Sequence, residues 1–329
     1  MNDQRKATAA VRWWRAVAFR CGTAHVVASV ALAWSGSGWT QLPDPRELLL
    51  ENAAPGVYVH YGAQAGMSTA NAGDVANFGF VVGATCVAVI DTGGSYAVGR
   101  ALRLAIRRIT SVPVCYVINT HVHPDHVFGN QAFVEDRSEF VGHARLAEAM
   151  RRRGPNYLHA LLRDLGVAAQ GSTLVLPTMA VAGIERLELG GRSLSLRAWP
   201  TAHTDTDLTV FDEVSETLWL GDLLFVGHLP VVDGNLRGFI AAIDLLKRLP
   251  AQRVVPGHGR AGTWPAAMLP EEHYLKRLLR DVRAALAARM PIAEAIETVG
   301  CDDAEHWLLV DQFHKRNVSA AYAELEWDP

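Results

Sequence analysis

The feature that most constrains this chain is a cluster of polar side chains directly after an apolar run. We predict the run, residues 113–119, to be a buried strand, and the segment after it reads Thr-His-Val-His-Pro-Asp-His. This segment, residues 120–126, contains the potential metal ligands His121, His123, Asp125 and His126. Imidazole and carboxylate together suit zinc and, less exclusively, iron or manganese. The segment therefore predicts a metal site at the end of a strand rather than a polar loop ahead of a helix.

The spacing of these ligands indicates two metal positions. In an extended segment alternate side chains point the same way, so His121 and His123 are expected to face one ion. After the turn at Pro124, Asp125 and His126 can reach a second ion a few ångströms away. Three later residues lie beside glycine or after a predicted strand, and we expect them to complete the set: His203, Asp222 and His258.

The rest of the chain alternates short strand-like runs with turns. A helix is predicted over residues 95–109, where Leu102, Ile106 and Ile109 recur at helical spacing. Strands are predicted at 57–60, 77–82, 86–90, 113–119, 184–189, 193–198, 208–212, 217–220 and 253–256, and further helices at 266–290, 292–299 and 311–327. Two β-rich halves with inserted helices predict an α/β (α+β) sandwich of two packed sheets flanked by helices, with a helical C-terminal extension.

The N-terminal segment predicts export. Basic residues at positions 5, 6, 12, 15 and 20 precede an apolar run that ends in Ala31-Leu32-Ala33. This pattern is typical of a secretory signal peptide over residues 1–33 and predicts a periplasmic protein with no stable membrane span after signal removal. An N-terminal membrane anchor is the alternative. We predict a linker at 34–54, a catalytic domain at 55–264 and a helical extension at 265–329.

Charge and cysteine content narrow the partners and the redox chemistry. The formal net charge is −3, and the densest basic run is only Arg151, Arg152 and Arg153. Nucleic-acid binding needs a basic face, so we expect a small-molecule substrate and no nucleic-acid partner. Cys86 and Cys115 stand in apolar strand-like runs, and we expect buried thiols there rather than a disulfide framework.

These motifs together resemble the metallo-β-lactamase superfamily over roughly residues 56–262. The family pattern is an Asp at a strand end, H-x-H-x-D-H, and then a His, an Asp and a His, and Asp91 in the segment Val-Ile-Asp-Thr-Gly-Gly supplies its first element. The resemblance implies the αββα sandwich of that family, with Asp91 hydrogen-bonded to a ligand imidazole. It also implies a ligand set of His121, His123 and His203 for one metal and of Asp125, His126 and His258 for the other, with Asp222 bridging both.

A narrower resemblance covers nearly the whole chain after the predicted signal. Residues 71–74, 120–130, 219–222, 313–318 and 322–327 are similar to those of the quinoprotein relay system zinc metallohydrolases. That resemblance implies an exported protein associated with pyrroloquinoline-quinone-dependent oxidation. A functional link to periplasmic quinoprotein dehydrogenases would follow.

The ligand set predicts a hydrolase with two zinc ions, iron or manganese being the alternatives. Zinc lowers the pKa of a bound water to about 7, so a bridging hydroxide could attack an ester, thioester or lactone. Asp125 and Asp222 are the predicted catalytic residues, and His228, His143 and His60 are candidates for substrate contact. Residues 61–77 could form either a flap over the site or a plain surface hairpin. Two other hypotheses stay open: a mononuclear iron persulfide dioxygenase on the same fold, and a non-catalytic accessory that binds metal or a quinone.

Overall fold

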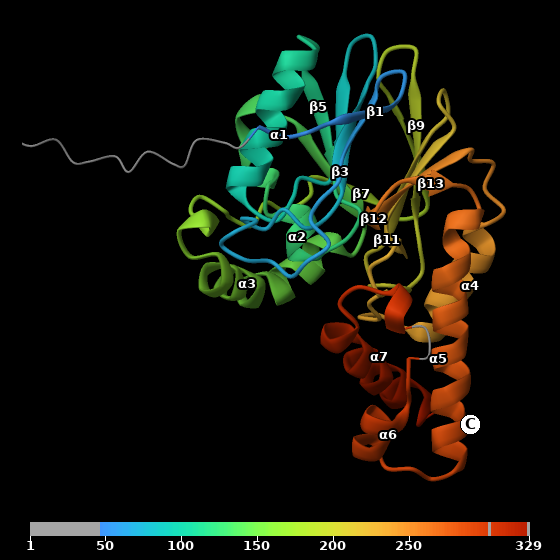
Figure 1. Ribbon diagram of the computed structural model, residues 1–329. Coiled ribbons are helices and arrows are strands. Elements are labelled where there is room, and N and C mark those ends of the chain that lie inside the picture. Colours follow the sequence, from blue (N-terminus) through green and yellow to red (C-terminus); the bar gives the residue numbers. More distant parts are fainter. Residues whose placement is uncertain (1–46, 302–303, 328–329) are drawn as a thin grey trace, which may run out of the picture. The chain divides into compact units, whose positions relative to one another are not determined.

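Two β-sheets packed face to face form the centre of the protein in its computed structural model (Figure 1). The structure describes residues 47–301 and 304–327. The predicted signal peptide and most of the predicted linker lie outside these residues. Within the described residues, no helix is both long enough and apolar enough to cross a membrane.

The first sheet changes from antiparallel to parallel at β4. Its strands follow the chain order: β1 (Glu51–Ala54), β2 (Val57–His60), β3 (Phe78–Val82), β4 (Val87–Ile90), β5 (Val114–Ile118), β6 (Glu139–His143) and β7 (Met179–Val181). From β1 to β4 the pairing is antiparallel, and from β4 to β7 it is parallel. Because parallel strands end at the same edge of a sheet, the segments after β4 and β5 begin side by side.

The second sheet has the order β13 (Gly262–Thr263), β12 (Arg253–His258), β11 (Thr217–Phe225), β10 (Leu208–Asp212), β9 (Ser193–Ala198) and β8 (Ile184–Glu188). Only β11 and β12 pair in parallel, so their carboxyl ends also lie next to each other. Residue 222 falls inside β11, because this strand continues to Phe225 beside β12. The prediction that the strand ends at residue 220 is therefore wrong.

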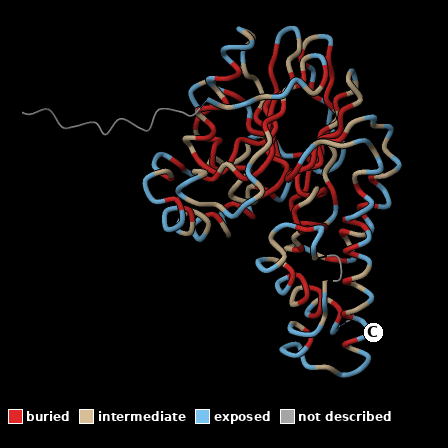
Figure 2. Tube along the Cα trace, in the orientation of Figure 1, coloured by how far each residue is buried: buried red, intermediate tan, exposed pale blue. Residues whose placement is uncertain are grey.

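Apolar side chains from both sheets fill the space between them. Val81, Ile90 and Ile118 of the first sheet share one buried cluster with Leu196 and Trp219 of the second. Figure 2 shows the buried residues concentrated along the facing strands. This arrangement confirms the predicted sandwich.

Helices cover the outer faces of both sheets. Helix α1 (Tyr96–Ile109) packs on the first sheet through Val98, Leu102 and Ile106, and α3 (Leu146–Leu165) packs beside the short α2 (Pro124–Val127). Helices α4 (Leu236–Leu246), α5 (Leu269–Ala287), α6 (Ile292–Thr298) and α7 (Val310–Leu325) share a buried cluster with the second sheet. The last three follow one another from orange to red in Figure 1.

Strand β1 corrects the predicted linker. Residues 51–54 pair antiparallel with β2 across a tight turn, and Ala54 is buried. Sequence composition predicts a linker up to residue 54. An edge strand, however, can pair through its backbone with few apolar side chains of its own. The linker prediction is therefore wrong over these four residues.

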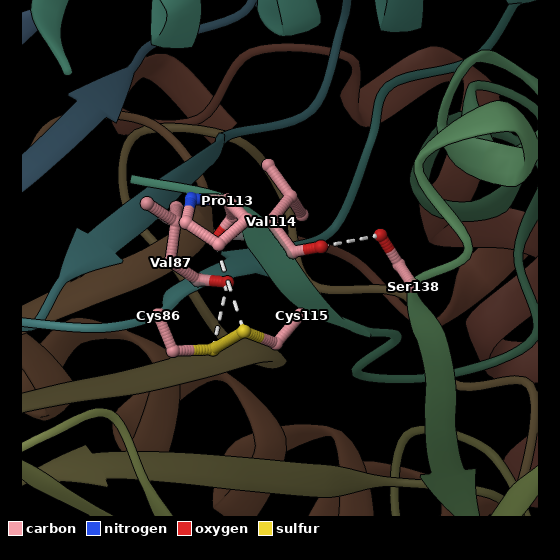
Figure 3. Close-up of a disulfide and its surroundings, with 6 residues drawn as sticks. All are labelled: Cys86, Val87, Pro113, Val114, Cys115 and Ser138. Carbon is pink, nitrogen blue, oxygen red and sulfur yellow. Dashed lines mark hydrogen bonds between the residues drawn. A yellow bond between two sulfur atoms is a disulfide. The ribbon is translucent and has the colours of Figure 1, made fainter. Parts of the chain in front are cut away.

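Cys86, just before β4, and Cys115, in β5, form a disulfide (Figure 3). The prediction of two buried thiols is therefore wrong. The strand register explains the pairing: Val87 pairs with Val114 and Ala88 with Tyr116, which leaves Cys115 as an extra residue in β5. Such a bulge redirects a side chain, and the two Cα atoms lie 5.6 Å apart, a normal separation for a disulfide.

Arg192, between β8 and β9, ties the two sheets together. Its Nε donates to Oδ1 of Asp212 at 2.9 Å, and its Nη1 donates to the carbonyl of Pro55 in the β1–β2 turn at 2.9 Å. Asp212 is buried. Burial alone would raise the pKa of Asp212, but hydrogen bonds from Arg192 and Ser215 lower it.

We expect Arg192→Ala to lower the free energy of unfolding by about 3–5 kcal/mol, because it leaves a buried carboxylate without its partner. Urea unfolding at pH 7 measures this loss. Since the folded-state pKa of Asp212 is lowered, the stabilisation is present at pH 7 and disappears as the pH falls through that pKa. The matched control is Arg186→Ala, whose exposed ion pairs with Glu188 and Glu213 should contribute less than about 1 kcal/mol. Equally small losses in both variants would contradict the assigned role.

Candidate metal centre

The structure brings the seven predicted ligands together at the carboxyl ends of β5, β11 and β12. They form two groups, and within each group the ligand atoms lie within 4.8 Å of one another. One group comes from the segment after β5, the β9–β10 loop and β11, and the other from the segment after β5 and the end of β12. The groups are His121, His123, His203 and Asp222, and Asp125, His126 and His258.

The carboxylate of Asp222 faces both groups. Its Oδ2 lies 3.5 Å from Nε2 of His121 and 3.3 Å from Nε2 of His203. Its Oδ1 lies 3.1 Å from Nε2 of His126 and 3.5 Å from Nε2 of His258. Each oxygen is therefore directed to a different set of imidazoles, which is the geometry of a bridging ligand.

Two glycines make room for this carboxylate. A Cβ atom on Gly257 would lie 1.9 Å from Oδ1 of Asp222, so no larger residue fits beside it. Gly221 has a φ of +51°, and a Cβ there would lie 2.5 Å from Oγ1 of Thr120. Glycine tolerates this backbone conformation and the close approach of the neighbouring segment.

Each of the five imidazoles has its outward nitrogen within hydrogen-bond distance of an oxygen. An N–H donated there fixes the outward nitrogen as the protonated one, so that the inward nitrogen is the one that can bind a metal. The pairs are His121 with Oγ1 of Thr120 at 3.0 Å, His123 with Asp233 at 3.1 Å, His126 with Asp91 at 2.8 Å, His203 with the Val231 carbonyl at 2.7 Å, and His258 with the Val75 carbonyl at 3.0 Å.

Three inward atoms are buried without a hydrogen-bond partner among the described residues: Nε2 of His121, Nε2 of His126 and Oδ1 of Asp222. Buried polar atoms nearly always have a hydrogen-bond partner, so three atoms without one at a single site need an explanation. Metal ions at this position would satisfy all of them. The donor set, imidazole nitrogens with carboxylate oxygens, fits zinc.

The two halves of the centre differ electrostatically. Burial lowers the pKa of His203 to about 4 and that of His121 well below its ordinary value, so these imidazoles stay neutral and ready to bind. Burial also lowers the pKa of His258, but Asp222 and Asp125 raise it to about 9. A metal ion entering the second half must therefore displace a proton.

Asp91 anchors the centre from the end of β4. Its Oδ1 accepts from the backbone N–H of Thr120 at 2.8 Å, and its Oδ2 accepts from the hydroxyl of Thr120 at 2.7 Å. The same Oδ2 faces Nδ1 of His126. Asp91 thus has the contact with a ligand imidazole that the family resemblance implies.

Asp233 contacts the imidazole of His123 as Asp91 contacts that of His126. Asp233 was not identified from the sequence. It also forms a hydrogen-bonded ion pair with Arg153, whose Nη1 reaches the hydroxyl of Tyr157 at 3.4 Å. Burial would raise the pKa of Asp233, but His123 and Arg153 lower it well below its usual range. Asp233 is 110 residues from His123, and nothing in its local sequence indicates the contact.

Asn317, on α7, is a second residue that sequence reasoning missed. Its Nδ2 donates to the carbonyl of Pro230 at 2.6 Å, and its Oδ1 accepts from the N–H of Val232 at 3.0 Å. The residue between them, Val231, provides the carbonyl that faces His203. Helix α7 therefore holds the backbone that positions a predicted ligand.

A cavity of about 500 Å³ opens onto the centre and reaches Asp125, Asp222 and His258. This volume suits a small organic molecule. Ala65, Gly66 and Met67 form part of its wall. The 61–77 segment therefore contributes to the wall of this cavity.

Of the three candidates for substrate contact, only His228 lines the cavity, where its ring lies 4.8 Å from the ring of His258. His60 and His143 are not among the residues that line this cavity, and each has a structural hydrogen bond. His60 contacts Oδ1 of Asp74 and the carbonyl of Leu49, each at 2.8 Å. Nδ1 of His143 accepts from the N–H two residues later at 3.0 Å.

We expect Asp233→Ala to weaken metal binding by about 10- to 100-fold, because such hydrogen bonds orient a ligand and raise its basicity. Competition with a chromogenic chelator measures this affinity. Asp205→Ala is the matched control, since Asp205 pairs with Arg152 and Arg153 but has no hydrogen bond to His123. Equal weakening in both variants would show that Asp233 only shapes the surrounding surface.

A curated relative shares part of the chain. The linear primary-alkylsulfatase of Pseudomonas sp. (strain ATCC 19151) is 26% identical over 244 residues, which is 60% of this chain and 43% of the relative. The chain therefore spans less than half the length of that protein.

Solved structures share the fold. TMB-1 superimposes with a TM-score of 0.55 at 19% identity, covering 70% of this chain and 97% of that one. A metallo-beta-lactamase from Pontibacter korlensis gives a TM-score of 0.55 at 20% identity, covering 70% and 99%. Residues 72–258, more than half of the 329, match the metallo-beta-lactamase superfamily. The chain belongs to this superfamily.

Proposed function

We propose that the chain is a dinuclear zinc hydrolase that cleaves an ester, thioester or lactone bond. One observation carries the proposal: the two oxygens of Asp222 are directed to two separate ligand groups. A mononuclear site would leave His126 and His258 without a function at the centre of a buried cluster.

Two zinc ions held here would supply an activated water at neutral pH and polarise the carbonyl under attack. Asp222 would keep the two ligand groups at a fixed separation. Asp125 is the proposed proton acceptor, because its carboxylate lies at the cavity wall with Oδ2 3.3 Å from Nε2 of His258. Asp91 and Asp233 would hold His126 and His123 in the orientation that binding requires.

The walls of the cavity support a small organic substrate. Met67, Val231 and Phe313 give it apolar surface, while Asp125, itself a predicted ligand, and His228 give it polar surface. Burial lowers the pKa of His228 to about 4, so this imidazole is neutral at physiological pH and can donate or accept a hydrogen bond. Similarity to an alkylsulfatase and to metallo-β-lactamases supports hydrolysis as the reaction class.

Removing a ligand of the second group tests the proposal. We expect His126→Ala or His258→Ala to lower bound zinc from about two ions per chain to about one and to reduce kcat/KM on the order of 10²-fold or more. Elemental mass spectrometry counts the metal, and a screen of esters, thioesters and lactones measures turnover. His159→Ala, an exposed residue of α3, should change neither. A wild-type chain with one iron that consumes oxygen with glutathione persulfide would instead establish the dioxygenase alternative.

We also propose that the protein is exported to the periplasm and cleaved after Ala33. The Cys86–Cys115 disulfide supports this, because disulfides persist in oxidising compartments. N-terminal sequencing of protein from the host periplasm should begin at residue 34, whereas an intact chain in the cytosol would contradict export. A functional link to quinoprotein dehydrogenases, proposed from the narrower resemblance, requires this export first.

A further inference from the structure

Helix α7 forms one wall of the cavity, although it lies beyond the region that matches the superfamily. Leu309, Gln312, Phe313 and Arg316 line the cavity. Gln312 and Arg316 are four residues apart on a helix and therefore lie on the same face, one above the other. The cavity thus has a cationic side chain and an amide next to each other on a wall that provides none of the seven ligands.

The other charged side chains around the cavity have partners of opposite charge or lie among the ligands. Asp164 forms two hydrogen bonds with Arg163, at 2.7 and 2.9 Å, and Asp233 pairs with Arg153. Arg316 instead lies with its guanidinium carbon 5.6 Å from the centre of the Phe313 ring. Within residues 47–301 and 304–327, no carboxylate comes within ion-pair distance of it.

Aromatic rings lie between the ligands and Arg316. The ring of Phe313 lies 5.3 Å from that of His228, which in turn lies 4.8 Å from the ring of His258. Gln312 lies against the 61–77 segment, since a Cβ on Gly66 would be 3.6 Å from its Oε1. A molecule extending from the metal centre along this wall would pass an aromatic surface and end beside a guanidinium and an amide.

We propose that Arg316, with the amide of Gln312, binds a carboxylate that the substrate carries at the end remote from the bond to be cleaved. The substrate class is then an ester, thioester or lactone of a dicarboxylic or similarly anionic acid, with an apolar segment between its two ends. Guanidinium and carboxylate form strong bidentate hydrogen bonds, which makes this pairing selective. This inference rests on the proposed hydrolase function and names the substrate class of the same site.

Binding of two matched acids to the zinc-loaded full chain tests the inference without requiring turnover. Hexanoate and adipate have the same chain length, but only adipate has a second carboxylate. We expect wild-type protein to bind adipate about tenfold more tightly than hexanoate, the effect of one charge-assisted hydrogen bond. Arg316→Gln should bind both acids with the affinity that the wild type has for hexanoate. Isothermal titration calorimetry measures all four values.

Lys315→Gln is the matched control, because Lys315 neighbours Arg316 but forms an ion pair with Glu297 away from the cavity. This variant should keep the preference for adipate. A wild type without that preference, including one that binds neither acid, overturns the inference, and so does an Arg316→Gln variant that weakens both acids equally. A preference for adipate that depends on Arg316 supports the binding site even if no ester is hydrolysed, and in that case the proposed function alone has failed.

Discussion

The hydrogen bonds that converge on Asp91 determine whether the two sheets can share a metal centre. Its carboxylate binds the backbone and hydroxyl of Thr120 and the imidazole of His126, so the ends of β4 and β5 are joined at one buried charge. The carbonyl of Thr120 then accepts from the N–H of Leu208 in the second sheet at 2.7 Å. Asp222 approaches from that second sheet, past Gly221 and Thr120. The ligands of the segment after β5 and Asp222 of the second sheet therefore meet at this junction.

The clustering of the seven potential ligands was predictable from sequence because its signals are local. Four ligands fall within residues 121–126, and the segments holding His203, Asp222 and His258 have turn residues beside them. The sandwich was predictable for a similar reason, since strands and α1 show their periodicity over short windows. The helical pattern of α3 is weaker in sequence, because Gly154 and Pro155 interrupt the middle of the helix. The predicted set therefore contains the elements with a strong local pattern.

What could not be predicted depends on contacts between distant segments. The Cys86–Cys115 pairing follows from a bulge in the β4–β5 register, which no sequence pattern specifies. The contacts of Asp233 with His123, and of Asn317 with the 230–232 segment, join residues 110 and 85–87 positions apart. For His60 and His143, a structural hydrogen bond and a substrate contact look alike in sequence. Only the folded chain distinguishes the two.

Asn317 also limits how freely this chain can be recombined with its relatives. The superfamily match ends at residue 258, so a chimaera joined there would retain all seven ligands and look complete in sequence. It would exchange α7 while keeping the backbone that α7 supports at Pro230 and Val232. A chimaera that keeps these hydrogen bonds must exchange the loop after β11 together with the C-terminal helices. These two segments form one structural unit, although more than 80 residues separate them in the chain.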